Sequence, residues 1–155
     1  MKTIAIIVAG GKGKRMGQPK QFLKIAGRPM LAWTLAAFQY ADAVDGIILV
    51  VAKEDIVRAR KQKFSKIIAV VPGGQERQDS VKNGLKSLPA SAEIVIIHDG
   101  ARPVVTAETI NRSARAAEKY GAVVVGVPVV DTIKTVDSRR LTVDRTLNRR
   151  VLWQA

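Results

Sequence analysis

Three short loops of the sequence contain the residue types that could do chemistry, namely glycines beside arginines, lysines and aspartates. They read AGGKGKRM at 9–16, PGGQERQDS at 72–80 and HDGARP at 98–103. Glycine-rich turns allow backbone N–H groups to approach phosphate oxygens closely, and cationic side chains balance the phosphate charge. The three loops therefore indicate a site for a phosphorylated ligand.

The first loop departs from both common phosphate-binding motifs. A P-loop requires Ser or Thr after its Gly-Lys pair, but here glycine follows the first such pair and Arg15 follows the second. The dinucleotide motif G-x-G-x-x-G requires a third glycine at the position of Met16. The loop instead presents Arg15 and, behind a proline, Lys20, which suit a polyphosphate whose charge changes during a reaction.

The composition favours an anionic partner without identifying it. The chain has 155 residues, which suits one domain, and a formal net charge of +13. Nucleic acid, a membrane surface and phosphorylated small molecules all fit this charge, but only 5% of the residues are aromatic, which is unusual for a nucleic-acid-binding module. The absence of cysteine excludes disulfides and thiolate metal sites and is compatible with the cytoplasm. The first apolar run is too short to span a membrane.

The pattern of apolar runs predicts alternating strands and helices. Expected strands are 4–9, 46–52, 66–71, 93–100 and 122–129, and expected helices begin at Pro29 and cover 54–62, 78–88 and 107–120. Such alternation, with strands that are apolar throughout, is typical of α/β proteins with a mostly parallel sheet covered by helices. Ligands of these sheets bind beyond the carboxyl ends of the strands, so we expect the three glycine loops to converge there.

The pattern changes after Val130. The segments TIKTV at 132–136 and LTV at 141–143 flank the turn signal DSRR at 137–140. We therefore predict a nucleotide-binding α/β domain at 1–130 and a projecting β-arm at 131–155. A hairpin that leaves its sheet has unpaired edges, and a partner subunit would bury them.

Five segments together indicate a family. AGGKGKRMGQPKQFL, GGQERQDSV, HDGARP, VPVVDTIK and LNRRVLW occur in the order found in bacterial methylerythritol phosphate cytidylyltransferases, and the sequence resembles that family over nearly its whole length. The first segment alone marks the wider nucleotidyltransferase superfamily. Its combination with the second and third segments is narrower and is shared with ribitol phosphate cytidylyltransferases. The resemblance implies a Rossmann-like nucleotidyltransferase sheet.

The resemblance also implies an activity. Members of the family transfer CMP from CTP to 2-C-methyl-D-erythritol 4-phosphate, with Mg²⁺ as cofactor, and release pyrophosphate in isoprenoid precursor biosynthesis. The resemblance further implies a cytoplasmic homodimer that associates through the arm. A ribitol phosphate cytidylyltransferase is the alternative within the same class. The attacking phosphate is already ionised at neutral pH, so no strong general base is needed, which agrees with a chain that has a single histidine. Catalysis would rest on alignment and on stabilisation of negative charge.

Residue roles follow from the positions that match the family. Arg15 and Lys20 would stabilise charge on the α-phosphate, with Arg149 as a further catalytic residue. The nucleotide would be bound by Ala9, Gly10, Gly11, Gly13, Gly74, Gln75, Ser80, Asp99 and Gly100. Asp99 would also contact the metal. The sugar-alcohol phosphate would be held by Arg102, Thr132 and Arg149, with the arm residues reaching the neighbouring subunit.

Two features depart from the family pattern. Gln75 stands where the family usually has Asp or Asn, so contacts to the base would run mainly through the backbone. The sequence stops at LWQA, whereas the family continues with a Thr-Pro-Gln segment, further helices and strands, and a lysine that positions the substrate phosphate. We therefore expect a fragment that binds CTP and turns over methylerythritol phosphate poorly or not at all. A non-catalytic CTP-binding fragment and a basic nucleic-acid binder are the alternatives from other classes.

Three residues near the loops also have structural interpretations. Ser80 could cap the helix expected at 78–88. Arg77 could orient its own loop through Asp79 or Glu76. His98, at the end of a strand, is expected to be a hydrogen-bonding residue rather than a base.

Overall fold

The structure is a computed structural model that describes residues 2–11, 17 and 19–155. Two compact units can be distinguished by their internal contacts, one ending at Gly121 and one formed by Ala122–Ala155, and each is described by itself. Within the described residues, no helix has the length and apolar character needed to cross a bilayer.

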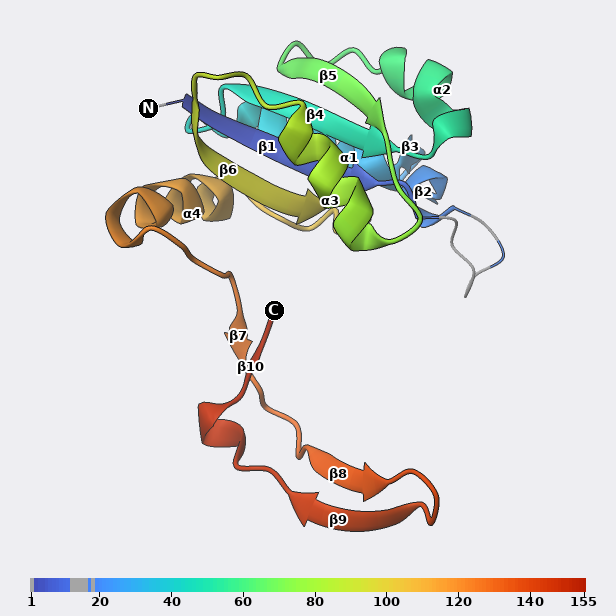
Figure 1. Ribbon diagram of the computed structural model, residues 1–155, viewed down its shortest axis with the longest axis vertical. Coiled ribbons are helices and arrows are strands. Elements are labelled where there is room, and N and C mark those ends of the chain that lie inside the picture. Colours follow the sequence, from blue (N-terminus) through green and yellow to red (C-terminus); the bar gives the residue numbers. More distant parts are fainter. Residues whose placement is uncertain (1, 12–16, 18) are drawn as a thin grey trace. The chain divides into compact units, whose positions relative to one another are not determined.

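A four-stranded parallel sheet forms the centre of the first unit (Figure 1). Its strands are β1 (Lys2–Ala9), β4 (Gly46–Val51), β5 (Ile67–Pro72) and β6 (Ala92–Asp99), in the order β5-β4-β1-β6. All three strand pairs are parallel. Every residue of β4 is buried, as expected for a central strand of a sheet that is covered on both faces. The predicted α/β class and the mostly parallel sheet are therefore confirmed.

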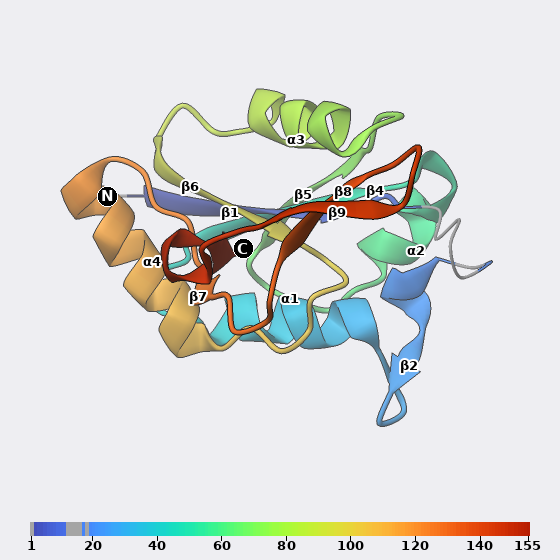
Figure 2. The ribbon, with the colours of Figure 1, turned by 90° about the horizontal axis from the view of Figure 1, so that it is seen from below.

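Helices cover both faces of this sheet (Figure 2). On one face lie α1 (Met30–Tyr40), α2 (Ile56–Arg60) and α4 (Ala107–Tyr120), and on the other lies α3 (Arg77–Lys86). Alternate residues of β1 and β4 point to opposite faces, which divides the core into two clusters. The cluster on the α1 side includes Ala5, Ile7, Leu49, Leu35 and Phe38, and the smaller cluster on the α3 side consists of Ile4, Ile6, Ile48 and Val50.

Short elements connect the main ones. The first loop ends in the 3₁₀-helix η2 (Lys20–Phe22), which is followed by a small hairpin of β2 (Lys24–Ile25) and β3 (Arg28–Pro29). A second 3₁₀-helix, η3 (Lys53–Asp55), leads into α2. Helix α4 begins where the Thr106 side chain accepts a hydrogen bond from the Thr109 amide at 3.1 Å. It spans the residues that the sequence predicts.

The second unit contains the predicted hairpin. Strands β8 (Lys134–Asp137) and β9 (Thr142–Thr146) pair antiparallel, and the Asp137 side chain accepts the Arg139 amide at 2.8 Å in the turn between them. A second small antiparallel pair joins β7 (Val127–Pro128) to β10 (Trp153–Gln154), with η4 (Arg149–Val151) just before β10. The two short β-like segments on either side of DSRR therefore correctly predicted a hairpin.

The fifth strand predicted at 122–129 is largely absent from the part of the chain that the structure describes. Only Val127–Pro128 is a strand, and its partner is β10 rather than a strand of the central sheet. Val124 and Val125 remain exposed. An apolar run becomes a strand only where another strand is available for pairing, and a sequence pattern does not show that partner. The first unit consequently ends at Gly121, before the expected domain boundary at 130.

Candidate functional site

The described start of the first glycine loop, Ala9–Gly11, lies together with the other two glycine loops at the carboxyl ends of the strands. The Gly73 amide donates to the Val51 carbonyl, and the Gly100 amide donates to the Val8 carbonyl, each at 2.7 Å. A Cβ placed on Gly73 would lie 3.8 Å from the Cα of Gly10, so the first and second loops are in backbone contact. The convergence that the sequence suggested is therefore present in the fold.

Two of these glycines are required by close packing. A Cβ on Gly100 would lie 2.8 Å from the Cβ of Ala9, and a Cβ on Gly74 would overlap the Cβ of Asp79. Any larger residue would push the loops apart. Their backbones can approach a ligand, and one another, only because the side chains are absent.

The second loop is held by hydrogen bonds to its own helix. Glu76 is the N-cap of α3 in a capping box, in which the Asp79 carboxylate accepts the Glu76 amide at 3.1 Å. The Ser80 hydroxyl accepts the Gly74 amide at 3.1 Å and donates to the Glu76 carbonyl at 3.3 Å, and the residue is only 4% exposed. Ser80 is therefore not the helix cap but a clamp that closes the loop. Gln75 is exposed beside it.

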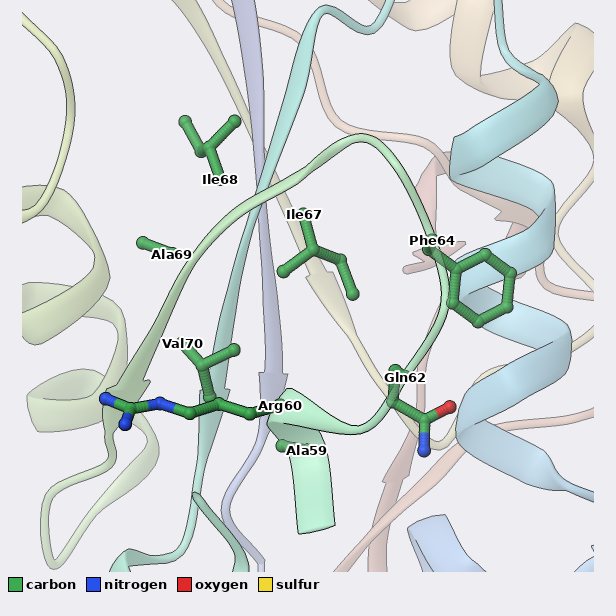
Figure 3. Close-up of a pocket in the computed structure, with 8 residues that line it drawn as sticks. All are labelled: Ala59, Arg60, Gln62, Phe64, Ile67, Ile68, Ala69 and Val70. Atoms are coloured by element: carbon green, nitrogen blue, oxygen red, sulfur yellow. The ribbon is translucent and has the colours of Figure 1, made fainter. Parts of the chain in front are cut away.

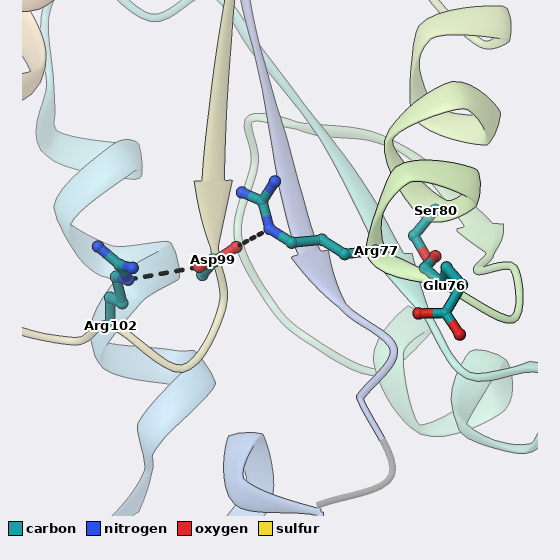
Figure 4. Close-up of polar contacts among 5 residues, drawn as sticks. All are labelled: Glu76, Arg77, Ser80, Asp99 and Arg102. Atoms are coloured by element: carbon teal, nitrogen blue, oxygen red, sulfur yellow. Dashed lines mark hydrogen bonds and ion pairs between the residues drawn. The ribbon is translucent and has the colours of Figure 1, made fainter. Parts of the chain in front are cut away.

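Asp99 lies between two arginines (Figure 4). The Arg77 Nε donates to one carboxylate oxygen at 2.9 Å, and the Arg102 Nε lies 3.3 Å from the other. The expectation that Arg77 acts through Asp79 or Glu76 is wrong, because those two residues pair with each other's backbone in the capping box. Arg77 follows β5 and Asp99 ends β6, on opposite edges of the sheet, so no sequence spacing could indicate their contact.

Asp99 was also the expected metal ligand. No cluster of three or more Asp, Glu, His or Cys side chains occurs among the residues described, so Asp99 is a single carboxylate rather than part of a preformed metal cage. Mg²⁺ is usually bound by one or two carboxylates together with substrate phosphates and waters. One carboxylate near a glycine-rich loop fits the usual way in which proteins bind a nucleotide-associated magnesium ion.

The remaining predicted residues fall into three groups. Arg15 and Gly13 lie outside the described residues. Lys20 opens η2, next to Gln21, whose side chain is 97% buried and has no partner for Nε2 among the described residues. Thr132 and Arg149 belong to the second unit, where the Arg149 guanidinium donates to the Val130 carbonyl at 2.7 Å.

His98 packs against an aromatic ring. Its ring centroid lies 5.1 Å from that of Phe38 at an angle of 56°, and its buried Nδ1 has no hydrogen-bond partner in the described part of the chain. The hydrogen-bonding role that we expected is therefore not found at Nδ1. Burial lowers the pKa of His98, although the neighbouring Asp99 charge acts in the opposite direction.

The lowered pKa of His98 predicts a loss of stability in mild acid. Below the unfolded-state pKa of about 6.5, His98 binds a proton more readily in the unfolded chain than in the folded chain. The stability that is present above this pH is therefore lost as the pH falls through the folded-state pKa. The slope for one proton is at most about 1.4 kcal/mol per pH unit. Urea unfolding at several pH values between about 5 and 8 measures it. The His98→Gln variant, which cannot titrate, should show a flatter profile, and identical profiles would contradict the prediction.

A pocket elsewhere in the first unit takes no part in this arrangement (Figure 3). It lies between α2 and the edge strand β5 and is lined by Ala59, Arg60, Gln62, Phe64, Ile67, Ile68, Ala69 and Val70. None of the predicted site residues is among them. The candidate site is the end of the sheet where the backbones of Gly10, Gly73 and Gly100 and the charged side chains of Arg77, Asp99 and Arg102 lie.

The chain is similar in sequence to a family of known enzymes. Residues 3–155 match the family model described as IspD, 2-C-methyl-D-erythritol 4-phosphate cytidylyltransferase. The chain belongs to this family. Curated members from Alkaliphilus metalliredigens and Syntrophus aciditrophicus are 45% and 44% identical over 98% and 99% of the chain. The chain spans about two thirds of their length, 66% and 68% respectively.

A solved structure of the family has the same fold. The crystal structure of 4-diphosphocytidyl-2C-methyl-D-erythritol synthase from Anaerococcus prevotii is 32% identical, with a TM-score of 0.84, over 99% of this chain and 67% of that one. The Rossmann-like nucleotidyltransferase fold implied by the sequence is therefore confirmed. The names of these relatives all refer to methylerythritol compounds, and none refers to ribitol phosphate.

Proposed function

We propose that this chain transfers CMP from CTP to 2-C-methyl-D-erythritol 4-phosphate, releasing pyrophosphate, in the cytoplasmic synthesis of isoprenoid precursors. The observation that carries this proposal is the family match over residues 3–155. The geometry supports it, because the matching glycine loops meet at the carboxyl end of the sheet, where α/β proteins bind ligands.

The reaction requires the protein to align the two substrates and to stabilise the negative charge that develops. An oxygen of the substrate phosphate attacks the α-phosphorus of CTP, the bond between the α- and β-phosphates breaks, and pyrophosphate leaves. In this scheme the backbone of Gly11 and Gly13 holds the triphosphate while Arg15 and Lys20 offset the negative charge that develops. The loop formed by Gly74 and Gln75, closed by Ser80, holds the cytidine.

In this proposal, magnesium binds together with the nucleotide. Asp99 would hold it beside the phosphates, and when bound it neutralises phosphate charge. Both Asp99 oxygens already face guanidinium groups, which lowers the tendency of this single carboxylate to collect a cation by itself. The metal is therefore expected to arrive with CTP.

The substrate phosphate would be held by Arg102, Thr132 and Arg149, with the last two supplied by the arm of a second subunit. Support for a dimer comes from the apolar side chains that the arm leaves exposed. They include Val136, Leu141, Val143 and Trp153. Apolar side chains on a hairpin with open edges favour burial against a partner.

Self-association through the arm can be measured directly. Val143 lies on β9 and is exposed, so Val143→Asp should shift the particle towards the mass of a monomer in light scattering by placing a charge in the proposed contact. Val57→Asp is the matched control, because Val57 is also exposed but lies on α2. A monomeric wild-type protein, or equal shifts in both variants, would count against the arm.

A pyrophosphate-release assay tests the proposed activity. CTP with methylerythritol phosphate should release pyrophosphate, whereas ribitol phosphate should be a poor acceptor. Calorimetry should show that CTP binds in preference to ATP and GTP in the presence of Mg²⁺. CTP binding without turnover would favour a non-catalytic CTP-binding chain. Equal affinity for all nucleotides, combined with salt-dependent binding to random DNA, would instead favour a basic nucleic-acid binder.

A further inference from the structure

The Asp99 carboxylate contacts two arginines that come from different loops. Arg102 lies three residues later in the same loop, and its backbone amide also donates to the Asp99 carbonyl at 3.1 Å. Its guanidinium is therefore part of the same turn as the carboxylate. Arg77 comes from the other edge of the sheet, at the first residue of α3. Figure 4 shows its side chain extending from that helix to Asp99.

The start of α3 gives Arg77 a defined position. The capping box of Glu76 and Asp79 encloses it, and the Ser80 hydroxyl ties the Gly74 amide to the same turn. Arg77 thus belongs to one hydrogen-bonded unit with the second glycine loop. Among the described residues, its contact with Asp99 is the only side-chain hydrogen bond or ion pair that joins this loop to the loop after β6.

We propose that Arg77 is a positioning residue, which fixes the Asp99 carboxylate relative to the second glycine loop. This inference rests on the function proposed above, in which that loop holds the nucleotide and Asp99 faces the phosphates. Within the described residues, loss of Arg77 leaves the carboxylate with only the longer contact to Arg102, which moves with its own turn. The Nε–H of Arg77 donates at 2.9 Å, whereas a lysine lacks a donor at that position in the side chain.

A purely stabilising role is the main competing explanation. The Arg77 and Arg102 side chains are 61% and 60% exposed, against 30% for Asp99. Exposed ion pairs of this kind contribute little to folding. Loss of Arg77 should therefore leave the unfolding temperature nearly unchanged while turnover falls.

A double-mutant cycle decides between direct and indirect action. Arg77→Met should lower kcat by about 10–100-fold, with a much smaller change in KM for CTP, because a displaced catalytic group typically costs that much. Since Arg77 acts through Asp99, adding Arg77→Met to Asp99→Asn should cause no further loss. Arg77→Lys should recover only part of the rate. Gln78→Met, an exposed neighbour in α3, is the matched control and should behave as wild type.

Two outcomes would overturn the proposal. If the two substitutions multiply in their effect on kcat, Arg77 contacts the substrate directly. If Arg77→Met lowers the unfolding temperature but not kcat, its role is structural.

If the protein releases no pyrophosphate at all, the proposed function is refuted. The contact between Arg77 and Asp99 is then tested by NMR. The Arg77 Nε–H resonance should shift in Asp99→Asn and stay in place in Gln78→Met. An unchanged resonance in Asp99→Asn would overturn the inference by itself.

Discussion

Replacement of Lys20 by alanine is expected to lower turnover about 10²–10³-fold while CTP binding changes little. A preorganised charge that stabilises the transition state typically contributes this much, because its interaction strengthens as negative charge develops. Lys20 opens η2, directly behind Pro19 and the first glycine loop. Arg15→Ala is expected to have a similar effect.

The measurement is the rate of pyrophosphate release at saturating CTP, together with the affinity for CTP from calorimetry. Lys24→Ala is a suitable control, because Lys24 is an exposed lysine on the adjacent strand β2. Normal turnover in Lys20→Ala would remove the catalytic role assigned to this residue. A loss of CTP affinity as large as the loss of rate would show that the lysine binds the ground state equally well.

Replacement of Gly84 by valine should destabilise the protein by about 2–3 kcal/mol. Gly84 lies on the buried face of α3, and a Cβ there would stand 2.5 Å from Cγ2 of Ile6 and 3.3 Å from Cγ2 of Val50. Ile6 is fully buried on β1, and its branched Cβ leaves the methyl group little freedom to move. Helix α3 must therefore move away from the sheet, which is the cost of overpacking. The better helix propensity of valine offsets only a few tenths of a kcal/mol.

Thermal unfolding measures this effect as a decrease in Tm of about 4–12 °C for a chain of this size. Lys82→Val introduces the same residue into the same helix at an exposed position and should change Tm only slightly. Equal decreases in the two variants would show that helix propensity, rather than contact with β1, determines the result.

The sequence predicted the central fold well because its signals are local. The strands β1, β5 and β6 are apolar runs that end at glycine or proline loops, and the helix at 107–120 has a threonine cap and a glycine end. The hairpin at 134–146 was predictable for the same reason, since an aspartate turn lies between two short runs rich in threonine and valine. The run at 122–129 was not predictable, because its state depends on which strand it can pair with.

The sequence by itself identified the family and the glycine loops, and it predicted that these loops meet at the carboxyl ends of parallel strands. Only the tertiary structure decided which side chains touch there. It placed Arg77 on Asp99 rather than on Asp79 or Glu76, made Ser80 a loop clamp rather than a helix cap, and packed His98 against Phe38. The physical reason is distance along the chain. Local backbone preferences are encoded within a few residues, whereas the contact between Arg77 and Asp99 exists only because the strand order β5-β4-β1-β6 brings two remote loops to the same end of the sheet.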